Sequence, residues 1–464
     1  MGFISYDFLI FFLIVFCLYW AFPKSKWQNF LIFASSLFFY GWLVPWHIIV
    51  LLLSTIVDYL LALGMIRWEK KSVIFMWIGI TLNILLIISV KYYFKYDEIL
   101  LTWAKDYGIS ESTVLLRNIL PLGTSFYTLK KISYLLDVHR GILEPQRDLI
   151  KFGSYVSFFP QVLSGPIERS QGFLKQLDIP RIWKAENFYN AWQLLIMGVF
   201  KKIVIANTVK VLVDQIFLIK EPSKIFLIIG GLGFTLQILA DFSSYTDLSR
   251  GISFLLGLKT TENFNKPYLA LTPNDFWNRW HISLSSWLRD YIFFPTRRTL
   301  LRIKFLPEIS AQILPPLLTM FISGLWHGTG NTFIVWGLYY GFLIVIYQFL
   351  GIRSDIKSFK RFFAWLIMFI IIVFGWVIFR SPSTGWLWNI LSNSPFINNV
   401  NEVIASLVLF TMIMFYSSFL YIKHLIDYFA PKHTNLLAFY YTSVVLITII
   451  FTKSSSPDFI YFQF

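Results

Sequence analysis

Long apolar runs separated by short polar segments are the main pattern along this chain. Several of them approach ~20 residues, the length at which a helix spans the hydrocarbon core of a bilayer. With weaker segments added, window hydropathy predicts roughly eleven to thirteen membrane helices, and therefore an all-α polytopic membrane protein. The clearest runs are Phe8–Phe22, Trp46–Ile66, Val73–Val90, Ile225–Leu239, Phe333–Leu350, Phe362–Phe379, Val403–Tyr421 and Leu436–Phe451.

Composition supports this interpretation. Of the 464 residues, 56% are hydrophobic and only 14% are charged, whereas a soluble domain has about 25% charged residues. The net charge of +15 is carried by residues between the apolar runs. This pattern indicates basic loops beside anionic lipid rather than a nucleic-acid surface. The single cysteine, Cys17, excludes an internal disulfide and a thiolate metal cluster.

The basic loops also predict the orientation of the chain. Helices are expected over Ile309–Trp326 and Thr332–Leu350, between one basic loop (Arg297, Arg298, Arg302, Lys304) and another (Arg353, Lys357, Lys360, Arg361). Because basic loops face the cytoplasm, the HGTGN turn between these helices should point away from it. The same alternation places the N-terminus and the tail Thr452–Phe464 outside a bacterial cytoplasmic (inner) membrane.

Three segments are apolar but interrupted by proline, glycine and charge: Asn118–Asp137, Phe152–Ile167 and Pro273–Pro295. Lipid does not tolerate unpaired backbone groups. We therefore expect re-entrant or interfacial pieces packed inside a helical shell. Without an internal repeat or a flexible linker, residues 1–464 are interpreted as a single membrane domain.

The segment Asn274–Asp290, NDFWNRWHISLSSWLRD, carries the first candidate chemistry, within a catalytic region at 273–295. Trp277, Trp280, Leu284 and Trp287 recur at helical spacing and predict one apolar face. An amphipathic interfacial helix with tryptophan anchors is one interpretation. It does not explain why a histidine, His281, and two arginine–acid combinations share the segment.

The second candidate region, 321–331, is FISGLWHGTGN, with His327 near a helix end. A lone histidine there is often structural, but ionisable groups at membrane depth tend to mark sites. Histidine is also the commonest general base, because its pKa lies near neutrality. Gly324, Gly328 and Gly330 predict open space through which a substrate approaches the ring.

Polar residues interrupt other apolar runs. Asp241 and Tyr245 fall four apart in Phe234–Gly251, on one face if that segment is helical. The alternative is a buried hydrogen-bond network between helices, which we favour for Asp58 and Asp247. Phosphate loops GxxxxGK[ST], zinc motifs HExxH, paired CxxC and GxSxG elbows do not occur. ATP-driven transport and metal hydrolysis have no local support, and no metal site is predicted.

Taken together, DFWNRWHISLSSWLRDYIFFP and the later GLWHG resemble the membrane-bound O-acyltransferases, more narrowly their bacterial branch that acetylates extracellular polysaccharides. The likeness spans most of the chain. The other segments that carry it, in order, are PLGTSFYTLKKISYLLDVHRG, SFFPQVLSGPI, GVFKKIVIAN, ILADFSSYTDLSRGISFLLG, NFNKPYLA and WVIFRSP.

The resemblance implies a ring of tilted helices around a central tunnel, with opposed funnels for a thioester donor and an acceptor. It implies that His327 is the catalytic base and that His281 lies on the segment lining the donor tunnel. It also implies that Tyr461, in the terminal FIYFQF, carries the acyl group; the alternative is an aromatic tail resting at the interface. Substrate binding is assigned to Trp326, Asn278, Arg279, Trp280, Asp241 and Tyr245.

We therefore predict an enzyme that moves an acetyl group across the membrane for O-acetylation of a polysaccharide such as peptidoglycan or alginate. The donor would be acetyl-CoA or an acyl carrier protein, with its phosphates at the loop of Arg297, Arg298, Arg302 and Lys304. An extracytoplasmic SGNH-type enzyme would be the partner; no bound cofactor and no nucleic acid is expected. A transporter or flippase of an acyl or glycan carrier is the alternative, and a scaffold that only docks an extracytoplasmic enzyme is a third hypothesis.

Overall fold

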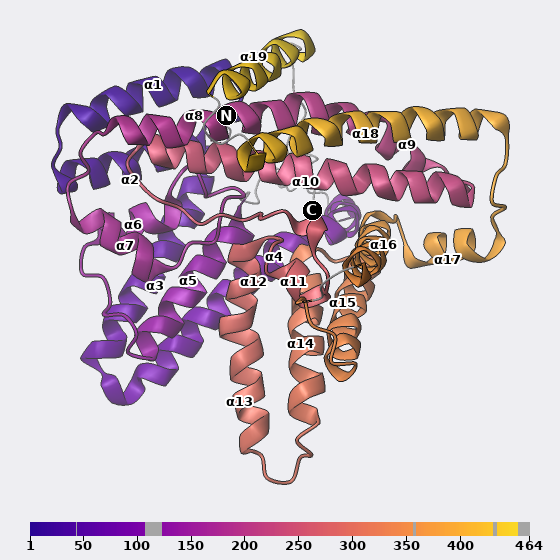
Figure 1. Cartoon of the computed structure of the whole chain (residues 1–464). Coiled ribbons are helices and arrows are strands. Elements are labelled where there is room, and N and C mark those ends of the chain that lie inside the picture. Colours follow the sequence, from indigo (N-terminus) through magenta and orange to yellow (C-terminus); the bar gives the residue numbers. More distant parts are fainter. Residues whose placement is uncertain (43, 107–122, 356–358, 430–433, 453–464) are drawn as a thin grey trace. The chain divides into compact units, whose positions relative to one another are not determined.

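The computed structural model describes residues 1–42, 44–106, 123–355, 359–429 and 434–452. Within these ranges all regular structure is helical and there is no strand (Figure 1), which confirms the predicted all-α class. The chain forms two compact units, Met1–Leu194 with Leu248–Glu262, and Leu195–Asp247 with Asn263–Phe464. The expectation of a single membrane domain stays a prediction.

The first unit is built mainly from the N-terminal helices. They are α1 (Tyr6–Ala21), α2 (Ser25–Gly41), α3 (His47–Arg67), the 3₁₀ turn η1 (Glu69–Lys71), α4 (Ser72–Asp106), α5 (Thr124–His139), α6 (Leu149–Ser157), α7 (Ser170–Asp178) and most of α8 (Ala185–Phe200).

The second unit contains most of the long helix α10 (Lys224–Leu255) and the C-terminal helices. The others are the π-helix η3 (Lys201–Ala206), α9 (Asn207–Leu218), η4 (Pro267–Leu269), α11 (Pro273–Trp277), α12 (Ile282–Leu288), the π-helix η5 (Arg289–Phe293), α13 (Phe294–Arg302), α14 (Ser310–His327), α15 (Asn331–Phe349), α16 (Lys360–Arg380), α17 (Thr384–Asn393), α18 (Val400–Phe429) and α19 (Thr434–Phe451).

Six of the described helical stretches are long and apolar enough to cross a membrane, and two shorter helices, α1 and α19, are also apolar. The chain is thus a multi-pass membrane protein. α14 is not among the six, because Gln312, Pro315 and Pro316 interrupt its apolar sequence. The expected total of roughly eleven to thirteen spans included weaker segments and stays a prediction. The six are His47–Arg67, Glu69–Lys91, Lys224–Leu255, Asn331–Phe349, Lys360–Arg380 and Val400–Lys423.

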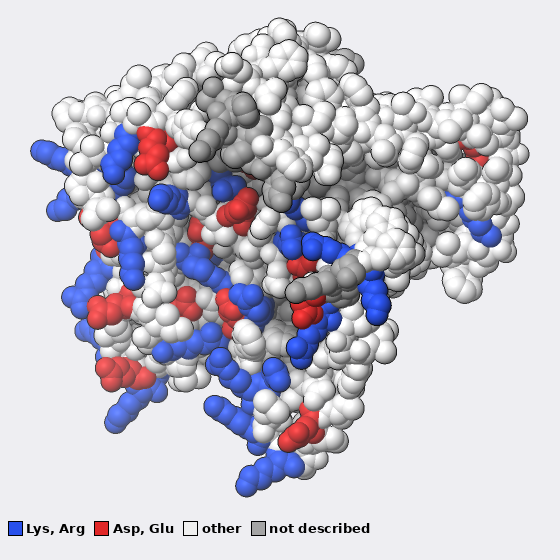
Figure 2. Space-filling view, viewed as in Figure 1, with Lys and Arg blue, Asp and Glu red and all other residues white. Residues whose placement is uncertain are grey.

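Five of these six stretches expose most of their apolar side chains, whereas Lys224–Leu255 is largely buried. Leu53 on α3, Ile370 on α16 and Leu407 on α18 are each more than half exposed. Water would penalise large apolar patches of this kind, whereas lipid is as apolar as the side chains themselves. Figure 2 shows wide areas without Lys, Arg, Asp or Glu on the face that it views.

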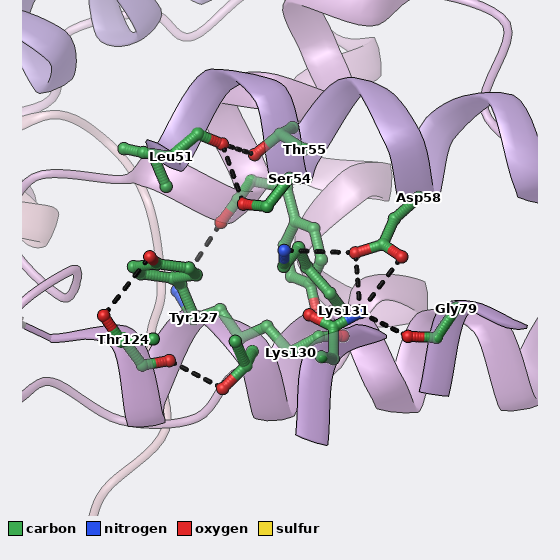
Figure 3. Close-up of polar contacts among 12 residues, drawn as sticks. Leu51, Ser54, Thr55, Asp58, Gly79, Thr124, Tyr127, Lys130 and Lys131 are labelled. Atoms are coloured by element: carbon green, nitrogen blue, oxygen red, sulfur yellow. Dashed lines mark hydrogen bonds and ion pairs between the residues drawn. The ribbon is translucent and has the colours of Figure 1, made fainter. Parts of the chain in front are cut away.

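A buried ion pair lies inside the first unit. Lys131 on α5 lies 3.1 Å from the Asp58 carboxylate on α3, and the Asn83 amide on α4 donates to both carboxylate oxygens, at 3.0 and 2.8 Å. Figure 3 shows this cluster between the helices. Because isolated buried charges are costly, the pair fixes how α3, α4 and α5 meet. The structural interpretation of Asp58 is confirmed.

A second buried chain of polar groups joins α5 to the irregular segment that follows α6. Lys130 donates to the Gln161 side chain at 2.9 Å, and Glu168 accepts from the backbone and the hydroxyl of Thr261. Residues 123–138 and 151–168 are almost entirely buried in the first unit. The described parts of Asn118–Asp137 and Phe152–Ile167 are therefore packed within protein, as their sequence predicts; 118–122 lie outside the described residues.

Candidate functional site

His327 is the last residue of α14 and is 5% exposed. Three aromatic rings surround its imidazole, with ring centroids 4.9 Å away for Trp326, 5.0 Å for Trp336 and 5.2 Å for Phe379. The ring therefore lies inside the second unit, against α15 and α16, and does not face lipid. The predicted helices on either side of the HGTGN turn are confirmed to within one residue at each end.

Glycines hold α14 and α15 together at this turn. A Cβ atom on Gly324 would lie 2.3 Å from the Phe333 carbonyl oxygen, and one on Gly337 would lie 2.3 Å from the Met320 carbonyl oxygen. A Cβ on Gly328 would meet the Phe333 ring at the same distance. The expectation that Gly324 and Gly328 leave open space is therefore wrong. These residues let two backbones touch, and this contact fixes where His327 sits.

His281 lies in a sharp break between α11 and α12, with left-handed backbone angles (φ 43°, ψ 53°). Asn263 holds the break, because its carbonyl accepts from the Ile282 amide at 3.0 Å and its side chain accepts from the Ser283 amide at 3.1 Å. The interpretation of this segment as one amphipathic helix is wrong, since these amides bond to Asn263 instead of continuing the helix.

The tryptophans of this segment also differ from the interfacial interpretation. Trp280 and Trp287 are 1% and 5% exposed, so they are core residues and not anchors at the membrane surface. Trp280 stacks on Phe276 at 5.8 Å and contacts Trp376 at 4.7 Å. This aromatic packing holds α11 and the His281 break against α16.

Trp326 contacts both histidines. Its ring centroid lies 6.0 Å from that of His281 and 4.9 Å from that of His327. The two imidazoles, which come from separate motifs, therefore belong to one site. His281 is outside the six candidate spans, and its burial lowers the pKa of its imidazole to about 3. It is consequently neutral at physiological pH and able to donate one hydrogen bond and accept another.

Asp241 and Tyr245 share one face of α10, which is helical throughout, and both are buried. Asp241 accepts from Lys202 on η3 at 2.7 Å, and Lys201 pairs in the same way with Asp247. The structural interpretation of Asp247 is confirmed. The next residue after Asp241, Phe242, contacts the His281 ring at 4.7 Å. Asp241 is thus connected to the site through its neighbour.

Sequence reasoning assigned no role to Lys202. Its segment, GVFKKIVIAN, contributes to the family resemblance but does not by itself predict a site residue. The available signal is a pair of lysines inside an apolar segment, which is costly without partners. The π-helix that carries Lys202 is itself of a kind that occurs often at functional sites.

Asn278 and Arg279 contact other groups. Asn278 lines a polar cavity of about 380 Å³ together with Thr272, Asn274 and Arg353. Arg279 pairs with Asp275 at 2.6 Å and is about one-third exposed. Tyr461 lies outside the described residues. In the ranges that the structure describes, His, Cys, Asp and Glu do not form a group of three able to hold a metal ion.

The four basic residues predicted to form a loop for donor phosphates are mostly helical, because Arg297, Arg298 and Arg302 lie within α13 and only Lys304 follows it. Arg297, Arg298, Arg302 and Lys304 are all exposed. Figure 2 shows basic side chains gathered where Figure 1 places the connection from α13 to α14. No acidic partner of these four residues is found among the described side chains. They remain available to an anionic group.

Comparison with known proteins gives consistent results. Residues 143–388, which include both histidines, match the sequence model of MBOAT, the membrane-bound O-acyltransferase family. The probable alginate O-acetylase of Pseudomonas aeruginosa is 32% identical over 413 residues, covering 84% of this chain and 74% of that protein. The peptidoglycan O-acetyltransferase of Helicobacter pylori is 29% identical over 79% of this chain and 73% of its own length. The teichoic acid D-alanyltransferase of Bacillus subtilis is 30% identical over 56% and 67%.

Proposed function

Since this chain belongs to the membrane-bound O-acyltransferase family and is an O-acyltransferase of the membrane, we propose that it acetylates an extracytoplasmic polysaccharide. Similarity to proteins named for alginate and peptidoglycan acetylation supports acetyl as the group transferred. A cytoplasmic thioester is the donor, either acetyl-CoA or an acetylated carrier protein. The exposed basic residues of α13 and of the connection that follows it suit its phosphates.

One observation carries the proposal: His281 and His327, buried and far apart in sequence, contact the same indole of Trp326. His327 takes the proton of an acceptor hydroxyl, and the resulting oxygen attacks the thioester carbonyl. The tetrahedral intermediate expels the thiolate, which recovers the proton from His327. The products are an ester and a free thiol. General-base assistance of this kind is worth about 10²–10⁴-fold in rate.

His281 has a different role in this mechanism. Because it stays neutral, it donates a hydrogen bond to the developing oxyanion, which is the largest electrostatic demand of acyl transfer. Surrounding tryptophan and phenylalanine rings exclude water from the thioester and limit its hydrolysis. Trp326 keeps the two imidazoles together, and Trp280 and Asp241 support the His281 segment.

The acceptor arrives from the opposite side of the membrane. In our proposal the HGTGN turn and both chain termini are extracytoplasmic in a bacterial inner membrane. The hydroxyl of Tyr461 accepts the acetyl group first, and an extracytoplasmic SGNH-type partner passes it to the polysaccharide. The sequence of the tail, FIYFQF, supports this relay.

The test is thiol release from acetyl-CoA by the full-length protein in lipid nanodiscs, with peptidoglycan or alginate fragments and the partner enzyme present. We expect His327→Ala to lower the rate by about 10²–10⁴-fold while the protein still inserts. His139→Ala is the matched control, because His139 ends α5 and bonds to Ser72 in the first unit. A His327→Ala protein that acetylates normally would remove the proposed base. Failure of the wild type to release thiol would favour a transporter.

A further inference from the structure

Arg181 carries a buried positive charge in the first unit. It lies in the irregular segment between α7 and α8 and is 5% exposed. Its Nε atom donates to the Tyr19 hydroxyl at 2.8 Å, and its Nη1 atom donates to the Ile179 carbonyl at 3.2 Å. Its Nη2 atom has no hydrogen-bond partner among the described residues. A buried charge is costly unless it is paired, so this guanidinium indicates an anion that the described chain does not supply.

Two other buried cations of the first unit do have acidic partners. Lys131 pairs with Asp58 at 3.1 Å, and Lys151 pairs with Asp178. Asp178 is the acid closest to Arg181 in sequence, and it is already committed to Lys151. In the part of the chain that the structure describes, no carboxylate forms an ion pair with Arg181. The missing negative charge must therefore come from another molecule.

Neighbouring groups fix the guanidinium and leave one edge of it unused. The Tyr19 hydroxyl donates to the Leu256 carbonyl at 2.9 Å, and the Tyr19 ring centroid lies 5.6 Å from the guanidinium carbon. The Gln28 side chain exchanges two hydrogen bonds of 2.9 Å with the Arg181 backbone. An arginine has five N–H groups; two are occupied here, and the others are on Nη1 and Nη2. These two nitrogens form the edge that binds a phosphate through parallel hydrogen bonds.

The segment around Arg181 has the character of a membrane–water interface. Ile182, Trp183 and Tyr189 are 68%, 41% and 63% exposed, and exposed apolar groups of this size are unfavourable in water. Residues 179–184 are irregular, and irregular backbone does not face the hydrocarbon core of a membrane. Tryptophan and tyrosine concentrate where both conditions meet, at the level of the lipid headgroups. We therefore expect Arg181 to lie at that level.

Three exposed lysines lie on the segments that meet here. Lys24 and Lys26 are at the start of α2, and Lys184 directly precedes α8. Gln28, which bonds to Arg181, is one turn beyond Lys24 and donates its amide to the Lys24 carbonyl at 3.0 Å. None of the three lysines pairs with an acid among the described residues. Basic residues beside a membrane surface attract anionic lipid.

We propose that Arg181 binds the phosphate of an anionic phospholipid. The three lysines attract the headgroup, and the exposed side chains of Ile182 and Trp183 contact the acyl chains. A free phosphate ion would satisfy the guanidinium but not this apolar flank. Because Nη2 is itself buried, the phosphate reaches it after a rotamer change of an exposed neighbour such as Ile182, which is a fast motion. The site lies in the first unit, whereas His281 and His327 lie in the second, so the inference does not depend on the proposed function.

The experiment is native mass spectrometry of the full-length protein in detergent, titrated with phosphatidylglycerol or phosphatidylcholine. We expect the wild type to prefer phosphatidylglycerol, because the choline charge offsets the phosphate. Arg181→Gln should weaken phosphatidylglycerol binding roughly 10- to 150-fold, which is the worth of a hydrogen bond to a charged group. Arg181→Lys should fall between the two, since it keeps the charge and loses the planar fork. Arg67→Gln is the matched control, because it removes the same charge from an exposed residue at the end of α3, and it should leave the affinity nearly unchanged.

Stability separates binding from a purely structural role. A lipid that binds the folded state raises its melting temperature, so phosphatidylglycerol nanodiscs should stabilise the wild type relative to phosphatidylcholine nanodiscs and should not stabilise Arg181→Gln. Lys184→Gln changes an exposed side chain without disturbing the packing, and it should weaken phosphatidylglycerol binding about 5-fold.

Three results would overturn the inference. The first is equal binding of the two lipids by the wild type. The second is unchanged phosphatidylglycerol affinity in both Arg181→Gln and Lys184→Gln, even if Arg181→Gln melts at a lower temperature in both kinds of nanodisc. The third is displacement of phosphatidylglycerol by inorganic phosphate, which would identify a site for a free anion instead of a lipid.

Discussion

The buried pair of Lys202 and Asp241 offers a quantitative test of how the second unit is held together. Its Nζ and Oδ1 atoms are 2.7 Å apart, and the side chains are 2% and 4% exposed. Lys202→Met retains the length of the side chain but leaves the carboxylate buried beside an apolar group. Removing one partner of a buried pair costs about 3–5 kcal/mol. We therefore expect Lys202→Met to destabilise the protein by that amount.

Removing both charges should be less harmful than removing one. Replacing a buried ion pair by apolar residues of similar volume is often neutral, so Lys202→Met with Asp241→Leu should recover most of the loss. SDS titration followed by tryptophan fluorescence measures the three variants as a double-mutant cycle. The expected coupling energy is at least about 3 kcal/mol, because each single substitution costs about 3–5 kcal/mol and the double substitution costs little. Arg289→Met is the control, because the Arg289–Asp290 pair is 50% and 42% exposed and should contribute less than about 1 kcal/mol.

Two outcomes would refute this reasoning. If Lys202→Met costs no more than Arg289→Met, burial does not amplify the interaction. If the effects of the two substitutions simply add, Lys202 and Asp241 do not act as a pair.

Two remaining predictions concern the histidines and the glycine contact. Gly337→Ala should destabilise the folded protein by about 1–3 kcal/mol and reduce thiol release, because the added Cβ meets the Met320 carbonyl. Gly172→Ala is the control; it has open space around it and should change neither stability nor thiol release. Burial lowers the pKa of His281 in the folded protein to about 3, whereas an imidazole in the unfolded chain has the ordinary pKa of about 6.5. As the pH falls below about 6.5, the unfolded chain therefore binds a proton before the folded protein does. Stability should therefore be full above that pH and decline between about 6.5 and 3, by about 2 kcal/mol at pH 5. His281→Gln should flatten this decline in a denaturation series across pH relative to His139→Gln, and an unchanged slope would contradict the assignment.

The helices were predictable because an apolar run of ~20 residues in lipid can pair its backbone N–H and C=O groups within itself only by forming a helix. Thus Thr332–Leu350 was expected and Asn331–Phe349 is observed. The family resemblance, carried by the two histidine motifs, is likewise confirmed. Trp326 is next to His327 in sequence, so its proximity followed directly, whereas Trp336 and Phe379 reach the imidazole from α15 and α16.

The rest depended on contacts between distant segments. The break at His281 exists because Asn263, in another loop, supplies its hydrogen-bond acceptors, and no periodicity reveals that. From the sequence alone, the glycines of α14 predict open space beside the backbone. In the structure, residues of α15 pack directly against these glycines. Lys202 is understood only once Asp241 is opposite it.

The backbone contact between α14 and α15 also limits which substitutions beside His327 the protein can accommodate. At Gly324 and Gly337 carbonyl oxygens of the facing helix already fill the space that a side chain would need, so a larger residue there would push the two backbones apart. We expect size selection among acyl groups to depend instead on Trp336 and Phe379, whose rings contact the imidazole. Trimming either ring is the rational route to a variant that transfers bulkier acyl chains.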